Sequence, residues 1–210
     1  NYVYDSFNLY PATVTNPLNQ STQYTYDYSS GKVKQITDPN TRVFQTIYDA
    51  LDRVIEEKQP DKTTPATLVT SATYSYNDSA SPRSVTKISY LDATLSNDSI
   101  TYLDGLDRTI QTRTRAEDVN TYSVKDVVYD NVGRMQKESL PYFATGTVYS
   151  SLTTNNLLLT TYTYDSVDRV LTAVNAVGTT SHAYDQWRQT STDAKGKIKD
   201  YTQDAYGNLV

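Results

Sequence analysis

The sequence predicts an all-β fold: a continuous antiparallel sheet of consecutive β-hairpins that forms a curved ribbon with almost no helix. Three observations support this prediction. The chain holds 20 tyrosines against three phenylalanines and one tryptophan, and tyrosine and threonine favour pleated, half-buried strands. A Tyr-Asp motif recurs along the whole chain. Turn residues follow the copies, and the period-two alternation that is typical of strands resumes after them.

One copy of the motif shows how a unit is expected to fold. Tyr162 and Tyr164 lie two residues apart, so both side chains fall on one face of a strand. Asp165 then opens a turn, because its carboxylate can accept a hydrogen bond from the backbone two residues on. Asp168 stands where the turn needs a left-handed backbone, and Arg169 begins the next strand. Each unit is therefore predicted to be one hairpin.

The units follow one another about 25 residues apart, with insertions. Leu103 replaces the tyrosine before Arg108, and Gln203 replaces it in the last copy. Because an isolated hairpin is marginal in water, consecutive units should pair edge to edge. The residues predicted to form the structural repeat motif are Tyr4, Asp5, Tyr26, Asp27, Tyr48, Asp49, Arg53, Arg108, Tyr129, Asp130, Arg134, Tyr164, Asp165, Arg169, Tyr184 and Asp185.

No domain boundary is visible between the units. Residues 1–210 are predicted to be a single repeat array and a piece of a longer protein, since the chain starts without methionine and ends on what looks like the start of a strand. The longest irregular stretch, residues 141–156, is expected to be an excursion loop.

These repeats resemble the YD-repeat, or Rhs-repeat, family. The segments YDALDRVI, LDGLDRTIQTRTRAED, VVYDNVGRMQKESLPYF and DAYGNLV look like its degenerate unit, and the resemblance covers essentially the whole chain. The family includes bacterial polymorphic toxin shells, the B and C subunits of insecticidal toxin complexes, wall-associated proteins and teneurin-like proteins. The resemblance implies a ribbon that spirals into a hollow shell, which encloses a toxic C-terminal domain in the bacterial members.

The chain departs from the family pattern at several turns. The family often has glycine where this chain has Asp52, Asp107, Asp168, Asn19 and Thr41. Aspartate and asparagine tolerate the left-handed backbone at a small cost, but β-branched Thr41 fits less easily, so a different turn is expected there. No DPxG-type self-cleavage motif is present. The resemblance therefore implies a piece of shell wall without processing site or toxin.

Composition argues against several functions. A net charge of −5 and a pI near 4.8 make the chain a poor candidate for binding nucleic acid. No apolar run approaches 18 residues, so no membrane insertion is expected. With no cysteine and one histidine, His182, we expect no catalytic, cofactor or metal site. His182 and Trp187 are interpreted as strand and packing residues.

The charged and aromatic strand faces have structural interpretations. Arg113 and Arg115, with Glu117 and Asp118 after them, are expected to form a solvated face or a cross-strand ion-pair ladder. The tyrosine stripes are expected to pack across neighbouring strands, with stacking on sugar rings as the functional alternative.

The leading hypothesis is a non-catalytic structural scaffold, a wall segment of an Rhs-type β-shell that encloses or presents a C-terminal toxin or effector. The alternative is an extracellular adhesin or filament-forming protein that binds carbohydrate or other cells. Expected partners are flanking repeats of the parent chain, an enclosed toxin domain, copies of the chain itself and carbohydrate. The expected location is secreted, extracellular or on the bacterial cell surface.

Overall fold

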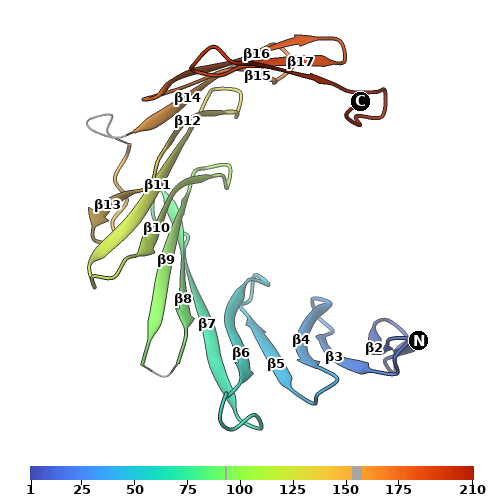
Figure 1. The fold of residues 1–210 in the computed structure, drawn as a ribbon. Helices are drawn as coiled ribbons and strands as arrows, with labels where there is room; N and C mark the ends of the chain where they lie inside the picture. The colour runs from blue at the N-terminus through green and yellow to red at the C-terminus, as the bar shows by residue number, and fades with distance from the viewer. Residues whose placement is uncertain (93, 153–157) are drawn as a thin grey trace. The chain divides into compact units, whose positions relative to one another are not determined.

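The computed structural model describes residues 1–92, 94–152 and 158–210 (Figure 1). Within these residues there are 18 strands and no helix, and antiparallel ladders join the strands into one sheet. None of the described segments is a helix long and apolar enough to cross a membrane. The prediction of an all-β fold built from paired hairpins is confirmed.

The chain divides into two compact units that are interleaved near residues 78–100. The first contains Asn1–Asp78 and Val85–Ser99, and the second contains Ser79–Ser84 and Ile100–Val210. The prediction that residues 1–210 are a single repeat array, part of a longer protein, stays a prediction. Each unit is described by itself below.

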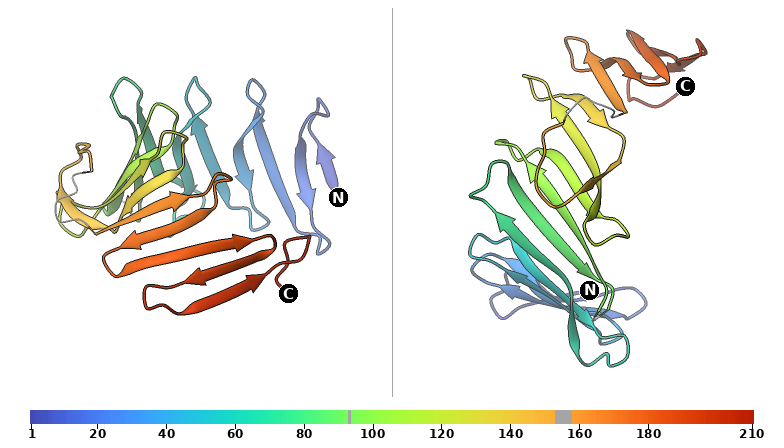
Figure 2. Two further views of the ribbon diagram at one scale, coloured as in Figure 1. Left: turned by 90° about the horizontal axis from the view of Figure 1, so that it is seen from above. Right: turned by 90° about the vertical axis from the view of Figure 1, so that its left-hand side faces the viewer.

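The first unit is a succession of hairpins in chain order. Each strand from β1 to β6 pairs with the next one in the sequence, so β1 to β7 form one continuous run of hairpins (Figure 2). Most of β8 (Arg83–Tyr90) and the start of β9 (Ser96–Leu103) also belong to this unit. The other strands are β1 (Tyr2–Tyr4), β2 (Pro11–Thr15), β3 (Ser21–Asp27), β4 (Lys32–Thr37), β5 (Val43–Tyr48), β6 (Val54–Pro60) and β7 (Leu68–Asn77).

The second unit repeats this plan with one interruption. Its strands are β10 (Thr109–Arg115), β11 (Thr121–Tyr129), β12 (Met135–Ser139), β13 (Tyr142–Thr145), β14 (Leu159–Tyr164), β15 (Val170–Asn175), β16 (Gly178–Asp185), β17 (Arg188–Thr192) and β18 (Ile198–Thr202). β14 pairs with β12, while β13 turns back and pairs with β11. The pairing of β12 with β14 therefore continues the hairpin ladder, although β13 lies between them in the sequence.

The excursion expected at residues 141–156 is not wholly irregular, because it contains β13. Its residues 153–156 lie outside the described residues. The described part returns over one face of β10 and β11, where Ile100, Tyr102, Tyr122 and Val124 form the small apolar core of this unit. Most other strand residues are only half buried, so the hairpins rely on contacts with their immediate neighbours.

The expectation of a solvated face around Arg113 is wrong. Arg113 is 2% exposed, and its strand neighbour Gln111 is fully buried. The alternation along β10 was assigned correctly, but the face it presents is covered by the excursion, which sequence periodicity cannot reveal.

The expectation of a different turn at Thr41 is also wrong. Thr41 adopts φ 64°, close to the 60° of Asp52 and the 58° of Asn19. Its N–H donates to the Asp38 carbonyl at 2.9 Å, and the Asp38 carboxylate accepts the amides of Asn40 and Arg42 at 2.8 Å each. These local bonds offset the roughly 1–2 kcal/mol that a left-handed backbone costs a residue with a Cβ.

Candidate functional site

The recurring structure of both units is the turn that closes a hairpin. In the hairpin of β14 and β15, Asp165 Oδ1 accepts the N–H of Val167 at 3.0 Å and that of Arg169 at 2.9 Å. Its Oδ2 accepts Arg169 Nε at 2.7 Å. Asp168, at φ 66°, donates its N–H to the Asp165 carbonyl. One carboxylate thus satisfies the turn amides and fixes the first side chain of the return strand.

The same arrangement appears at other copies. The carboxylates that accept two turn amides and an arginine Nε in this way are those of Asp49, Asp104, Asp130 and Asp165. Asp5 and Asp27 also accept turn amides, but without an arginine. Further aspartates that close turns, outside the residues predicted to form the repeat motif, are Asp38, Asp61, Asp92, Asp193 and Asp204. Each of these carboxylates accepts backbone N–H groups two to four residues further on, so aspartate at the first position of a turn is the sequence signal that they share.

These hydrogen bonds set the protonation of the turn carboxylates. At Asp165, partial desolvation opposes ionisation, but the N–H and guanidinium of Arg169 and the N–H of Val167 outweigh it and lower the pKa below the ordinary 3.8. At Asp49 the backbone N–H of Arg53 is the largest influence, and it also lowers the pKa. The turns therefore hold ionised carboxylates at neutral pH.

Asp185 does not fit the expected pattern. It ends β16 and pairs directly with Arg188 across a two-residue turn, in which Gln186 has φ 51°. Within the described part of the chain, no backbone N–H donates to its carboxylate. The expectation that Asp185 caps its turn is wrong; its turn is one residue shorter than the turns that Asp49 and Asp165 close.

The motif tyrosine connects its hairpin to the preceding one. Tyr164 OH donates to the carbonyl of Met135, the first residue of β12, at 2.6 Å. Corresponding bonds run from Tyr26 to Pro11, Tyr48 to Val33, Tyr76 to Val54, Tyr129 to Thr109 and Tyr184 to Val170. Tyr4, in the first hairpin, is 52% exposed and makes no such bond to any described residue.

A β-bulge precedes several of the motif tyrosines, but not Tyr184, whose ladder has a continuous register. The register of the ladder shifts between Thr163 and Tyr164, and between Val128 and Tyr129. The same shift precedes Tyr4, Tyr26 and Tyr48. A bulge re-aims the side chain next to it, but it is not required for the carbonyl bond, because Tyr184 reaches the Val170 carbonyl without one. Period-two alternation predicted none of these bulges.

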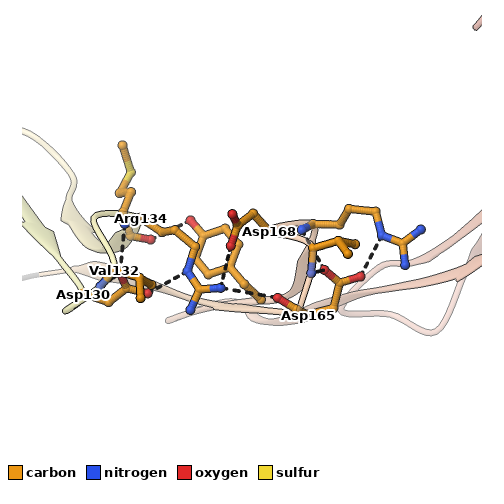
Figure 3. Close-up of polar contacts among 9 residues, drawn as sticks. Asp130, Val132, Arg134, Asp165 and Asp168 are labelled. Atoms are coloured by element: carbon orange, nitrogen blue, oxygen red, sulfur yellow. Dashed lines mark hydrogen bonds and ion pairs between the residues drawn. The ribbon is translucent and has the colours of Figure 1, made fainter.

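The turn arginine completes the connection between hairpins. Arg134 donates from Nε to Asp130 in its own turn at 2.8 Å, and its Cζ lies 4.8 Å from the ring centroid of Tyr164 in the next hairpin. Its Nη1 also reaches Asp168 at 2.9 Å (Figure 3). We call this set of aspartate, arginine and next-hairpin tyrosine the Asp-Arg-Tyr joint.

The joint recurs with small variations. Arginine–ring distances are 4.0 Å for Arg53 over Tyr76, 4.3 Å for Arg108 over Tyr129 and 4.3 Å for Arg169 over Tyr184. Lys32 takes the arginine role over Tyr48 at 5.1 Å. The sequence identified these residues as a motif, but it did not show that each arginine contacts the tyrosine of the following copy.

Chemically, the joint is suited to holding strands together. The turn carboxylates are occupied by amides and guanidinium groups, and the tyrosine hydroxyls by carbonyls. His182 lies half-buried in β16 with Nδ1 3.3 Å from the Gln189 amide nitrogen. Among the described residues, no group of three or more His, Cys, Asp or Glu side chains could hold a metal ion.

Comparison with known proteins gives two family matches. Residues 72–207 match the family described as "Domain of unknown function (DUF6443)", and residues 28–64 match "RHS Repeat". No curated protein matches the chain.

Several solved structures share the fold. The crystal structure of TcdB2-TccC3 matches with a TM-score of 0.80 at 16% identity, over all of this chain and 14% of that chain. A structure of the Photorhabdus luminescens Tc holotoxin pore matches with a TM-score of 0.79 at 13% identity, over all of this chain and 16% of that one. This chain thus spans only a small part of the length of the solved chains it matches. At these identities the likeness establishes the fold.

Proposed function

Since the chain belongs to the DUF6443 family and is an Rhs-repeat protein, we propose that it is a non-catalytic structural scaffold, a wall segment of a toxin-type β-shell. The observation that carries this proposal is the Asp-Arg-Tyr joint. The recurring aspartate and arginine side chains close one hairpin, and the recurring arginine and tyrosine side chains join it to the next. Side chains that recur from unit to unit and hold each hairpin to the next are suited to a continuous wall.

In this proposal, the flanking repeats of a longer parent chain extend the sheet at both ends, and a C-terminal toxin or effector is enclosed or presented by it. The fold shared with TcdB2-TccC3 and with the Tc holotoxin pore supports this assignment. The parent protein would then act outside the cell that makes it.

The adhesin alternative receives less support from the site. Sugar-binding aromatic residues need a free ring face and free polar groups at the rim. Tyr76, Tyr129 and Tyr184 instead carry an arginine over the ring, and their hydroxyls are bonded to carbonyls.

Protease protection of the parent protein tests the proposal. The region C-terminal to the repeats should resist digestion in the intact parent and become sensitive when the wall is weakened by Arg134→Met with Tyr164→Leu. Tyr201→Phe is the matched control, because Tyr201 lies 39% exposed in β18 outside any joint. Equal digestion of that region in the intact, weakened and control proteins would refute an enclosing wall, and glycan binding by the intact protein would favour the adhesin.

A further inference from the structure

The excursion between β12 and β14 is separate from the hairpin ladder. Ser139 of β12 lies directly opposite Leu159 of β14, and the Leu140 N–H donates to the Leu158 carbonyl at 2.8 Å. The chain therefore leaves and rejoins the ladder at adjacent points. The segment 142–150, which we call the strap, contributes nothing to the pairing of β12 with β14.

The first part of the strap adds a strand to β11. Thr145 pairs with Thr121 and Tyr142 pairs with Val124 in the antiparallel ladder of β13. Tyr142 OH also donates to Asp126 Oδ2 at 2.7 Å, while Phe143 is 74% exposed. This is the geometry by which an extended peptide adds to a free strand edge.

The second part of the strap is bound mainly through its backbone carbonyls. Arg113 Nη1 donates to the Gly146 carbonyl at 2.8 Å, and Gln111 Nε2 donates to the Ser150 carbonyl at 2.8 Å. Tyr102 OH donates to the Thr147 carbonyl. Two side chains of this part are also bound: Ser150 Oγ accepts Arg113 Nη2 at 3.0 Å, and Tyr149 contacts the Tyr102 ring and packs against the apolar core.

The donors are held in place by a buried row of polar groups. Arg113 Nε donates to Gln111 Oε1 at 2.8 Å, and Gln111 Nε2 donates to Asp126 Oδ1 at 2.6 Å. Arg113, Gln111 and Asp126 are 2%, 0% and 2% exposed. A buried charge is costly unless it is paired and hydrogen-bonded, and here Asp126 balances Arg113 through Gln111. Bonds within the sheet thus help to orient the donors, and Tyr142 of the strap adds a bond to Asp126.

We propose that this face of β10 and β11 is a binding site for a polypeptide segment that adds a strand to β11 and then bends, and that the strap occupies it in cis. Three features together support the proposal: a strand edge on β11, donors that capture carbonyls, and an occupant that lies outside the ladder. The partner is therefore defined by a strand followed by a bend, as at Gly146 with φ 79°, and by aromatic side chains at the positions of Tyr142 and Tyr149, which pack against the apolar core. The inference does not depend on the proposed wall function.

Excision of the strap is the direct test. Residues 141–157 are deleted from the full chain, and Leu140 is joined to Leu158 by an Asn-Gly turn, which suits a two-residue hairpin connection. The variant should fold with a cooperative melt. A labelled synthetic peptide of residues 141–152 should bind it in fluorescence anisotropy, and should not bind the intact chain, whose site is filled.

Two substitutions in the excised chain make the test specific. Arg113→Met should weaken peptide binding roughly tenfold or more, because hydrogen bonds from a charged donor are lost. Arg169→Met, which removes an exposed arginine of a joint, should leave it unchanged. Failure of the excised chain to fold, absence of peptide binding, or equal binding by the intact and excised chains would each overturn the proposal.

A second measurement uses the intact chain. In Arg113→Met, chymotryptic cleavage after Tyr149 should accelerate roughly tenfold, because the Gly146 carbonyl and Ser150 Oγ lose their donor, while cleavage within the strands is unchanged. Arg169→Met should cleave there at the wild-type rate. An unchanged rate in Arg113→Met would show that Arg113 does not hold the strap.

Discussion

Arg134 and Arg113 lie in the same unit and have different roles. Arg134 sits at the surface, with 28% of its side chain exposed, and contacts the Asp130 carboxylate of its own hairpin and the Asp168 carboxylate and Tyr164 ring of the next one. Arg113 is buried beneath the strap and donates to backbone carbonyls and Gln111. The first belongs to a repeated, local arrangement, whereas the second occurs once and depends on a segment more than 30 residues away. The difference shows that the repeat builds the ladder, and that an insertion creates the buried site.

The largest expected effect comes from removing a buried charge. Asp126→Asn leaves Arg113 buried without its counter-charge and should lower the free energy of unfolding by about 3 kcal/mol. Asp168→Asn makes the same substitution at the exposed partner of Arg134, and should change it by less than about 0.5 kcal/mol. Urea unfolding measures both.

The double variant Arg113→Met with Asp126→Asn should recover much of the stability lost in Asp126→Asn, since no unpaired charge remains. Similar losses for Asp126→Asn and Asp168→Asn would contradict the distinction drawn between the two arginine sites.

The next effect concerns the turn carboxylates. Asp165→Ala removes bonds to two turn amides and should cost about 1 kcal/mol, whereas Asp185→Ala should be near neutral because that carboxylate caps no amide. Thermal melts of the two variants compare them directly. If Asp165→Ala melts no earlier than wild type, or if both variants lose equally, the capping role is wrong.

How well the sequence predicted each feature depends on how far apart the interacting residues lie in the chain. The turn at Asp165 was predictable, because all its partners lie within four residues. The bulge before Tyr164 and the stacking of Arg134 on its ring were not, since they depend on how adjacent hairpins meet. The exposure of Arg113 was predicted wrongly, because the sequence of β10 does not indicate that the strap covers this face.

A smaller effect is expected at the tyrosine of the joint. Tyr164→Phe keeps the ring under Arg134 and removes only the bond to the Met135 carbonyl, so it should cost about 0.5–1.5 kcal/mol. Tyr201→Phe, at a tyrosine with no such carbonyl bond, is the control and should be close to neutral. Equal chemical-denaturation midpoints for the two variants would show that the Tyr164 hydroxyl does not stabilise the fold.

The turn carboxylates also predict an acid dependence. The pKa of Asp165 is lowered in the folded chain, so its contribution is present above the unfolded pKa of about 3.9 and is lost as pH falls through the lower folded value. The stability difference between wild type and Asp165→Ala should therefore be constant near neutral pH and shrink below about pH 4. A difference that stays constant down to pH 2 would show that ionisation of this carboxylate is not what stabilises the turn.

A double-mutant cycle on Arg134 and Tyr164 tests most directly whether the joint couples neighbouring hairpins. Unfolding free energies of Arg134→Met, Tyr164→Leu and the double variant should give a coupling of about 0.5–1 kcal/mol, as expected for a stacked cation at a partly exposed site. The control cycle of Arg134→Met with Tyr184→Leu should give none, since the Tyr184 ring carries Arg169. A coupling of zero between Arg134 and Tyr164, or equal coupling in both cycles, would contradict the claim that each hairpin is held to the next by this contact.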